Sequence, residues 1–334
     1  MPRVADLLER EALRTVSQPL GLPPISTPLP WQGPQWARVG DQLASGQFPH
    51  ALLLAGPEGL GKTRFALALA RLLLCHQPAD GLNCGQCSAC DLSANGSHGD
   101  FRWLAPEEKS RFIKVEQVRA ATDFVSRTAS YGARKVLVLQ PADAMNASSA
   151  NALLKCLEEP AGETVIILVC QRLHALPATV RSRCQMLKFA IPEGEVAADW
   201  LDQATGDRSL SNSLLSLAEQ RPLSALALFE QDLAEGVAGI RAALEGLAAG
   251  QVTVPQARDL LASEELGASL ALVTTHIQRT LRGLQAEQLR SVRARRLYEL
   301  LDELGRNRAA LSAGSNPNPG VMLDSVLSRL ATVG

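Results

Sequence analysis

A glycine-rich segment at residues 56–63 has the residue types and spacing of a phosphate-binding loop. It reads Gly-Pro-Glu-Gly-Leu-Gly-Lys-Thr and fits the pattern G-x-x-x-x-G-K-[ST]. Its three glycines, which allow backbone N–H groups to surround a phosphate, are Gly56, Gly59 and Gly61. Lys62 adds a positive charge, and Thr63 offers a hydroxyl to Mg²⁺. The segment therefore predicts nucleotide binding, and the alternative is a relic loop that keeps the turn and binds nothing.

Hydrolysis at such a loop needs a carboxylate at the end of a neighbouring strand to hold Mg²⁺, and a further group to position water. The candidate strand, residues 136–139, is followed by Gln140 and Pro141, where an acidic pair is expected. Asp143 lies beyond the proline, and we expect it to be misplaced for metal binding. The sequence thus predicts at most a nucleotide holder that lacks hydrolytic activity of its own.

A dense group of cysteines follows the phosphate loop and the helix expected after it. The spacing is Cys-x8-Cys-x2-Cys-x2-Cys, made by Cys75, Cys84, Cys87 and Cys90. Four thiolates suit tetrahedral Zn²⁺, and a closed four-sulfur site is structural because it leaves no position open for water. An iron–sulfur cluster uses similar spacing, and unliganded thiols are the remaining alternative. Nearby His76 and His98 could substitute as ligands.

Apolar runs alternate with helical segments between residues 50 and 190, which is the signature of a parallel α/β sheet. The expected strands are residues 51–55, 101–104, 136–139, 165–169 and 186–189. The expected helices include residues 62–74, 114–127 and 148–159. The other three cysteines, Cys156, Cys170 and Cys184, fall within or beside these elements and are expected in the core.

Composition shifts along the chain divide it into four segments. Residues 1–30 form an N-terminal extension or linker, and the six prolines between residues 19 and 34 predict an extended stretch. Residues 31–191 form the α/β domain with the cysteine module at 75–90. Residues 192–232 are expected to form a small helical lid, and residues 233–334 a separate all-helical domain with an amphipathic helix at 290–306.

The overall composition is that of a globular protein, with 46% hydrophobic and 20% charged residues in 334. A net charge of −1 and an aromatic content of 4% argue against a stand-alone nucleic-acid-binding protein and a base-stacking platform. The longest apolar stretch, residues 65–75, is interrupted by Arg71 and is too short to span a membrane. Charges also interrupt the N-terminus, so we expect a cytosolic protein with reduced cysteines.

The combination of motifs resembles the bacterial replication clamp-loader subunits, which are ring-forming ATPases of the AAA+ class. The resemblance is carried by the phosphate loop, the four-cysteine module, the segment Ala-Asn-Ala-Leu-Leu-Lys-Cys-Leu-Glu-Glu-Pro at 150–160 and Ser-Arg-Cys at 182–184. It implies that residues 31–191 form an AAA+ ATPase-fold domain and that residues 233–334 form an oligomerisation collar. It also implies that the chain joins motor gamma or tau subunits and delta in a hetero-pentameric ring. Such a ring places a sliding clamp on primed DNA for the DNA polymerase III holoenzyme.

Departures from the motor-subunit pattern identify which kind of subunit the chain resembles. Gln140 and Pro141 replace the acidic pair, and Cys170-Gln171 follows the strand where motor subunits carry a threonine that senses the γ-phosphate. Leu223 is the nearest match to the arginine of the lid helix. These losses imply the stationary, non-hydrolysing member of the ring. Some stationary subunits also have a broken phosphate loop, whereas this loop is intact, so ATP and Mg²⁺ binding stays open.

Arg183 is the candidate catalytic residue, again through the resemblance. In this family the arginine of Ser-Arg-Cys projects into the ATP site of the adjacent motor subunit, as an arginine finger acting in trans. A guanidinium presents planar donors to phosphate oxygens and stabilises negative charge in the transition state. The alternative is a local salt bridge. Glu158 and Glu159 stand at the end of a helix before Pro160, and we expect them to be structural or solvated.

Two other functions remain open. The chain could be an active motor ATPase of the same family, which ATP hydrolysis by the isolated chain and its loss in Lys62→Ala would favour. It could also be a zinc-containing nucleic-acid-binding protein with a vestigial ATPase fold. Tight DNA binding with a steep salt dependence would favour that function.

Overall fold

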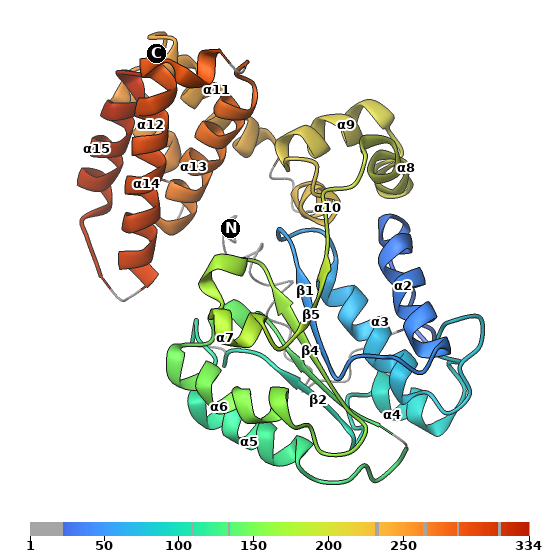
Figure 1. The fold of residues 1–334 in the computed structure, drawn as a ribbon. Coiled ribbons are helices and arrows are strands. Elements are labelled where there is room, and N and C mark those ends of the chain that lie inside the picture. Colours follow the sequence, from blue (N-terminus) through green and yellow to red (C-terminus); the bar gives the residue numbers. More distant parts are fainter. Residues whose placement is uncertain are drawn as a thin grey trace. The chain divides into compact units, whose positions relative to one another are not determined.

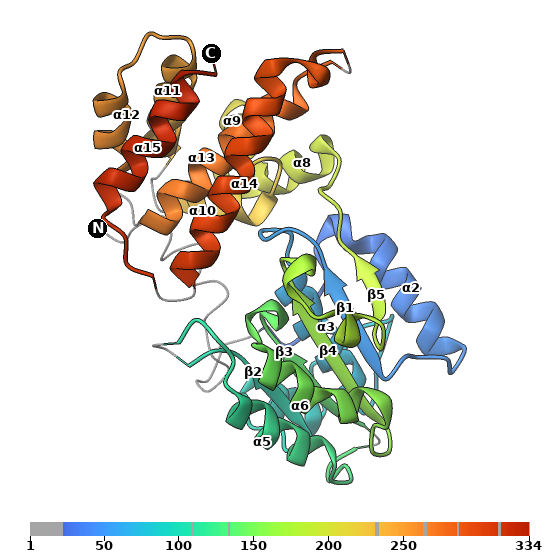
Figure 2. The same ribbon diagram turned by 60° about the vertical axis from the view of Figure 1, so that its left-hand side comes forward.

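The computed structural model describes residues 23–107, 110–132, 134–230, 234–262, 266–285, 287–312 and 315–333. Residues 1–22 of the expected N-terminal extension lie outside the described residues. The described chain divides into two compact units, residues 23–226 and 227–333, and the division falls within helix α10 (Pro222–Glu230). The first unit holds the sheet and the expected lid helices, and the second holds helices of the expected collar (Figures 1 and 2).

The described part of the first unit contains one parallel sheet with the strand order β2-β3-β4-β1-β5. The strands are β1 (Ala51–Ala55), β2 (Phe101–Leu104), β3 (Lys135–Leu139), β4 (Thr164–Cys170) and β5 (Gln185–Lys188). All five predicted strands are confirmed, with ends that shift by no more than one residue. Because β1 and β3 each pair in parallel with β4, the carboxyl ends of β1, β3 and β4 share one edge of the sheet. The loops that carry the candidate phosphate site leave the sheet at that edge.

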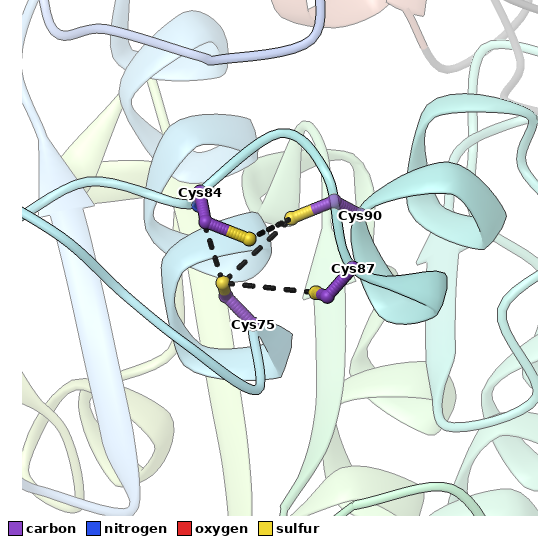
Figure 3. Close-up of side chains that lie close together, drawn as sticks. All are labelled: Cys75, Cys84, Cys87 and Cys90. Carbon is purple, nitrogen blue, oxygen red and sulfur yellow. Dashed lines mark hydrogen bonds between the residues drawn. The ribbon is translucent and has the colours of Figure 1, made fainter.

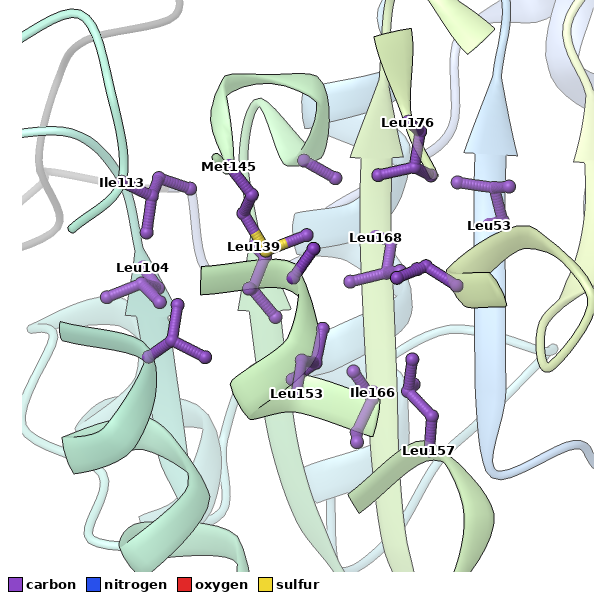
Figure 4. Packing of buried hydrophobic residues seen from close by; sticks show 14 of the residues in the cluster. Leu53, Leu104, Ile113, Leu139, Met145, Leu153, Leu157, Ile166, Leu168 and Leu176 are labelled. Atoms are coloured by element: carbon purple, nitrogen blue, oxygen red, sulfur yellow. The ribbon is translucent and has the colours of Figure 1, made fainter. Parts of the chain in front are cut away.

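Apolar side chains fill both faces of this sheet, as expected for parallel strands covered by helices. Neighbouring positions of β1 alternate between two clusters, with Leu53 on one face and Leu52 and Leu54 on the other. Leu53 belongs to the cluster that also contains Leu153 and Leu157 of helix α6 (Ala147–Glu158), shown in Figure 4. Helices α5 (Val115–Val125) and α6 cover that face.

The opposite face of the sheet is covered by helices α2 (Gly33–Ala44) and α3 (Lys62–Leu74). Phe65 of α3 is fully buried and makes edge-to-face contacts with Trp36 of α2 and with Phe189. Helix α3 has the bounds predicted from the sequence. The packing of α3 fixes its first residues, and therefore the phosphate loop, against the ends of β1 and β3.

The proline-rich stretch departs from its prediction at its C-terminal end. Residues Pro30–Gln32 form a 3₁₀ turn, and α2 begins at Gly33 with Pro34 in its first turn. A proline is tolerated there because the first helical N–H groups lack an intrahelical partner in any case. Residues 23–29 contain neither helix nor strand and bend at residues 24 and 25, and the expected extended conformation is wrong for residues 30–34.

Short helices complete the first unit, and a helical core forms the second. The remaining elements of the first unit are α4 (Ser88–Ala94), η2 (Ala142–Ala144), η3 (Leu173–Ala175), α7 (Ala178–Arg181), α8 (Gly194–Thr205) and α9 (Arg208–Leu217). Those of the second are α11 (Ala234–Ala248), α12 (Val254–Leu261), α13 (Leu266–Arg282), η4 (Gln288–Arg290), α14 (Val292–Ser312) and α15 (Pro319–Ala331). Leucine, isoleucine and valine side chains from these helices form its core. Within the described chain, no helix combines the length and apolarity needed to cross a membrane.

Candidate functional site

The phosphate loop joins β1 to α3, as the sequence predicts. Gly59 and Gly61 have φ angles of 78° and 77°, in the left-handed region that favours glycine. Gly61 is also the N-cap of α3, so the first N–H groups of the helix have no intrahelical partner. These N–H groups and the helix dipole can bind an anion such as a phosphate.

Packing also favours glycine in the loop, most strongly at Gly56, where backbone rather than a movable side chain lies close. An added Cβ would lie 2.3 Å from Phe189 O at Gly56, 2.2 Å from Ser224 Oγ at Gly59 and 2.2 Å from Leu29 Cδ1 at Gly61. The glycine pattern is thus explained by the fold alone, with or without phosphate. Whether the loop works depends on the lysine and threonine that follow.

Segments on either side of the domain hold the loop by its carbonyl groups. Gln32 is buried, and its Nε2 donates to Leu60 O at 2.9 Å and to Gly61 O at 3.0 Å. From the expected lid, Leu223 N donates to Gly59 O at 3.1 Å. These bonds leave the loop N–H groups to face an anion. The sequence analysis missed Gln32, because a glutamine at a helix start carries no recognisable signal.

Lys62 is buried beside the loop, with 4% of its surface exposed. Its Nζ donates to Pro57 O at 2.6 Å. Burial lowers the pKa of Lys62 to about 8, against smaller opposing effects of Glu58 and Cys170. The ammonium is therefore still mostly protonated at pH 7, at a cost that a bound phosphate would offset.

Lys62→Met is expected to stabilise the nucleotide-free chain at pH 7 while removing the charge that a phosphate needs. The fall in the pKa of Lys62 from 10.5 to about 8 corresponds to a cost of about 3 kcal/mol for burying its charged form, at 1.36 kcal/mol per pKa unit. Because the folded-state pKa is lowered, this cost is present below pH 8 and is relieved as pH rises from 8 to 10.5. Thermal unfolding of wild type and Lys62→Met at pH 7 and at a pH of about 10 measures this cost. A variant no more stable than wild type at pH 7 would contradict the interpretation.

Thr63 receives a hydrogen bond from the residue that replaces the expected acidic pair. Gln140 follows β3, is 1% exposed, and its Nε2 donates to Thr63 Oγ1 at 2.7 Å. Gln140 Oε1 is buried and has no hydrogen-bond partner. An uncharged amide thus stands where hydrolysis would require a carboxylate for Mg²⁺.

Asp143, the first carboxylate after Gln140 in the sequence, binds residues that follow β4. Its Oδ1 accepts from Gln171 N at 2.9 Å and its Oδ2 from Arg172 Nε at 2.9 Å, both just after β4. The Asp143 side chain is 1% exposed in this ion pair. The residues near Thr63 therefore do not fit a resident Mg²⁺, which prefers an octahedral set of oxygen ligands with one or two carboxylates.

The cysteines outside the module lie in or against the core, as predicted. Cys170 is fully buried at the end of β4, and burial raises the pKa of its thiol to about 12. Cys156 and Cys184 are partly buried and pack against the same apolar cluster. A neutral, buried thiol at Cys170 cannot sense a γ-phosphate in the way a threonine hydroxyl can.

The lid brings an arginine to the loop that the sequence comparison with motor subunits missed. A Cβ at Gly59 would lie 3.1 Å from Arg221 Cβ, and Arg221 Nε donates to Ala218 O at 2.9 Å. Leu223, the residue matched from the sequence, contacts the loop through its backbone. The sequence feature that could have identified Arg221 is its position directly before Pro222, at the start of a helix.

The four cysteines of the module converge on one point (Figure 3). Their sulfur atoms all lie within 4.8 Å of one another, and three pairs are separated by 3.7, 3.9 and 3.9 Å. Tetrahedral coordination at a Zn–S distance of about 2.3 Å needs sulfur atoms about 3.8 Å apart. The cluster therefore fits a single tetrahedral metal ion.

Without a metal, these thiols differ in their protonation. Hydrogen bonds from the backbone N–H groups of Gln86 and Cys87 lower the pKa of Cys84 to about 6, whereas burial raises that of Cys75 to about 12. A bound dication would hold all four as thiolates. The two nearby histidines serve other groups: His76 Nε2 bonds to Tyr131 O at 3.1 Å, and His98 Nδ1 accepts from Asp100 N at 3.1 Å.

Arg71 and Asn83 connect the cysteine module to residues 23–26. Arg71 is 1% exposed, and its guanidinium donates to Pro23 O at 2.7 Å, Pro24 O at 2.8 Å and Ser26 Oγ at 2.7 Å. Asn83 accepts from Ser26 N at 2.9 Å and donates to Cys90 Sγ at 3.4 Å. Burial lowers the pKa of Arg71, while Cys90 and Cys75 raise it. A buried cation next to a tetrathiolate site offsets part of its negative charge.

Arg183 lies just after α7 and is one-third exposed. Its Nε and Nη2 both approach Glu158 Oε1, at 2.7 and 2.5 Å, and its Nη1 donates to Thr179 O at 2.9 Å. The structure therefore places Glu158, at the end of α6, against the candidate finger. In the single chain Arg183 makes the local salt bridge considered as the alternative to a role in trans.

Part of the chain is similar to known proteins. Residues 31–193 match the family model described as DNA polymerase III, delta subunit. DNA polymerase III subunit delta' of Pseudomonas aeruginosa is 42% identical over 208 residues, covering 62% of this chain and 62% of that protein. The corresponding delta' subunit of Escherichia coli is 36% identical over 204 residues, covering 61% of each.

The chain spans less than two thirds of the length of the curated relatives it matches. Among solved structures, a gamma-subunit-related protein of Thermotoga maritima aligns at 17% identity with a TM-score of 0.47, over 90% of this chain and 99% of that chain. That likeness supports no statement about function. Residues 31–193, which hold the phosphate loop, the four cysteines and Arg183, are thus similar to the DNA polymerase III delta-subunit family, and the relatives named here are delta' subunits.

Proposed function

We propose that this chain is the non-hydrolysing delta' subunit of a replication clamp loader. In this role it joins motor gamma or tau subunits and delta in a hetero-pentameric ring. The ring opens a sliding clamp and places it on primed DNA for the DNA polymerase III holoenzyme. Residues 227–333 supply the helical collar for that assembly, and residues 23–226 supply the AAA+ unit.

One observation carries the non-hydrolysing part of this proposal. Gln140 donates an amide hydrogen to Thr63, so the side chain at the end of β3 offers Thr63 a donor in place of a metal ligand. Asp143 is engaged by Gln171 and Arg172. The loop keeps Lys62 and the N-terminus of α3, so it can hold the phosphates of ATP without promoting hydrolysis.

Catalysis by this chain would occur in trans, through Arg183. The guanidinium is one-third exposed and already engages a carboxylate oxygen of Glu158. Exchanging that carboxylate for a phosphate oxygen of a neighbouring subunit's ATP keeps a charge-assisted hydrogen bond throughout. An arginine finger of this kind acts on charge that develops in the transition state.

The metal of the cysteine module is Zn²⁺ in this proposal, with a structural role. Sulfur separations of 3.7–3.9 Å match one ion at the centre of four thiolates. An iron–sulfur cluster places several iron and sulfide atoms between its cysteines and spaces them more widely. Elemental analysis of the purified chain is expected to give one zinc per chain and no iron-dependent colour.

The function is tested by comparing the isolated chain with the reconstituted assembly. We expect the isolated chain to hydrolyse no ATP above background, and the motor and delta subunits to need this chain for clamp loading. Hydrolysis by the isolated chain that Lys62→Ala abolishes would instead identify a motor subunit. Tight DNA binding by the isolated chain, weakened steeply by salt, would favour the nucleic-acid-binding alternative.

A further inference from the structure

We propose that the phosphate loop of this chain binds the polyphosphate of a nucleotide without a magnesium ion, with Thr63 acting as a hydrogen-bond donor to phosphate. This inference rests on the nucleotide binding proposed above and names the form of its ligand. Its ligand is bound by the loop, independently of the helices at 227–333 and of Arg183.

The hydrogen bond between Gln140 and Thr63 sets the direction of the threonine hydroxyl. A hydroxyl has one O–H donor and two acceptor lone pairs. The Gln140 amide occupies one lone pair of Thr63 Oγ1 at 2.7 Å. The O–H of Thr63 can then be donated to a phosphate oxygen at the N-terminus of α3. In a loop that holds Mg²⁺, the same oxygen faces the metal.

The surroundings of this pair offer too few oxygen ligands for a hard divalent cation. Pro141 and Cys170, at the ends of β3 and β4, have no side-chain oxygen, and the carboxylate of Asp143 is engaged by Gln171 and Arg172. The unpartnered oxygen in this region is Gln140 Oε1, a neutral amide oxygen. Mg²⁺ sheds its water reluctantly and is usually held by one or two carboxylates together with phosphates.

Positive charge for the phosphates comes instead from the protein. Lys62 is buried against the loop, and its ammonium lies 2.6 Å from Pro57 O. The N-terminus of α3 adds its dipole and free N–H groups. These groups provide the neutralisation that Mg²⁺ supplies in a hydrolytic site.

Equilibrium binding of a fluorescent ATP analogue to the full chain tests the inference. Titrations are made in excess Mg²⁺ and in EDTA at the same ionic strength. We expect wild-type Kd values that agree within about 3-fold, because counter-charge and hydrogen bonds come from the protein. Binding at least 10-fold weaker in EDTA than in Mg²⁺ would overturn the proposal.

Replacing the Gln140 amide by a carboxylate is expected to make nucleotide binding depend on Mg²⁺. Gln140→Asp places a carboxylate near Thr63, so binding should become at least about 10-fold tighter in Mg²⁺ than in EDTA. Gln47→Asp adds the same charge on an exposed turn after α2 and should leave the ratio near one. A Gln140→Asp protein that folds, as judged by thermal unfolding, and still binds equally in both buffers would count against the proposal.

Thr63→Val provides a second test that keeps the volume of the side chain. If Thr63 donates to phosphate, this variant should weaken binding by a similar factor with and without Mg²⁺. If Thr63 is a metal ligand, the loss should appear only in Mg²⁺, which would overturn the inference. Absence of binding by wild type in both buffers would overturn it together with the proposed nucleotide binding, and the test of Arg183 in the assembly would be unaffected.

Discussion

Arg183→Ala is expected to leave assembly of the proposed ring intact and to slow ATP hydrolysis at the adjoining motor site by on the order of 10³-fold. The Arg183 guanidinium is one-third exposed. Its removal leaves Glu158 without this partner, but the Glu158 side chain is half-exposed and can be solvated. Folding should therefore change little, because exposed ion pairs contribute roughly 0–1 kcal/mol. Steady-state ATPase of the reconstituted assembly, with size-exclusion chromatography for its formation, measures both quantities.

Two matched variants separate a role in trans from a local salt bridge. Glu158→Gln removes the partner carboxylate while keeping Arg183, so turnover should stay close to wild type if Arg183 acts on the neighbouring ATP. Arg183→Lys keeps the charge but loses the planar fork and should remain strongly impaired. If Glu158→Gln were as slow as Arg183→Ala, the salt bridge itself would be the functional element. Unchanged turnover in Arg183→Ala would remove the assignment altogether.

Removing the metal from the cysteine module is expected to release residues 23–26 from the domain as well as the module itself. Metal binding to four-ligand zinc peptides is worth on the order of 10 kcal/mol, so the thiols would not hold this geometry without it. Arg71 would then lose the nearby thiolate charge that supports its burial. Hydrogen–deuterium exchange should accelerate by at least about 100-fold in residues 75–98 and at the amide of Ser26, which represents residues 23–26 because Pro23 and Pro24 have no amide hydrogen, with β3 and β4 unchanged.

Asn83→Ala is the control that separates this coupling from general unfolding. It keeps all four cysteines but removes the side chain that joins Ser26 N to Cys90 Sγ. We expect the metal to remain bound, by elemental analysis, while exchange increases in residues 23–26. If neither removal of the metal nor Asn83→Ala changed the exchange rate in residues 23–26, this segment would be held independently of the metal.

Local chemistry and periodicity determined much of the architecture. Runs of Val, Ile and Leu that are buried on both faces identified β3 and β4, because few other environments accept such runs. The G-x-x-x-x-G-K-[ST] pattern identified both the loop and the start of α3, and the spacing of the cysteines identified the cluster that could hold a metal ion. The prediction was wrong at residues 30–34, where prolines begin a helical segment that a count of prolines does not reveal.

Only the tertiary structure decided which residues meet. Gln140 and Thr63 are 77 residues apart, and Arg71 and Ser26 are 45 apart. Such pairs depend on strand order and helix packing, which no local pattern encodes. The sequence by itself determined that a phosphate loop, four cysteines with the spacing of metal ligands and a Ser-Arg-Cys arginine exist on an α/β frame. The fold decided that the Gln140 amide donates a hydrogen bond to Thr63, because the order β3-β4-β1 brings the end of β3 to the start of α3.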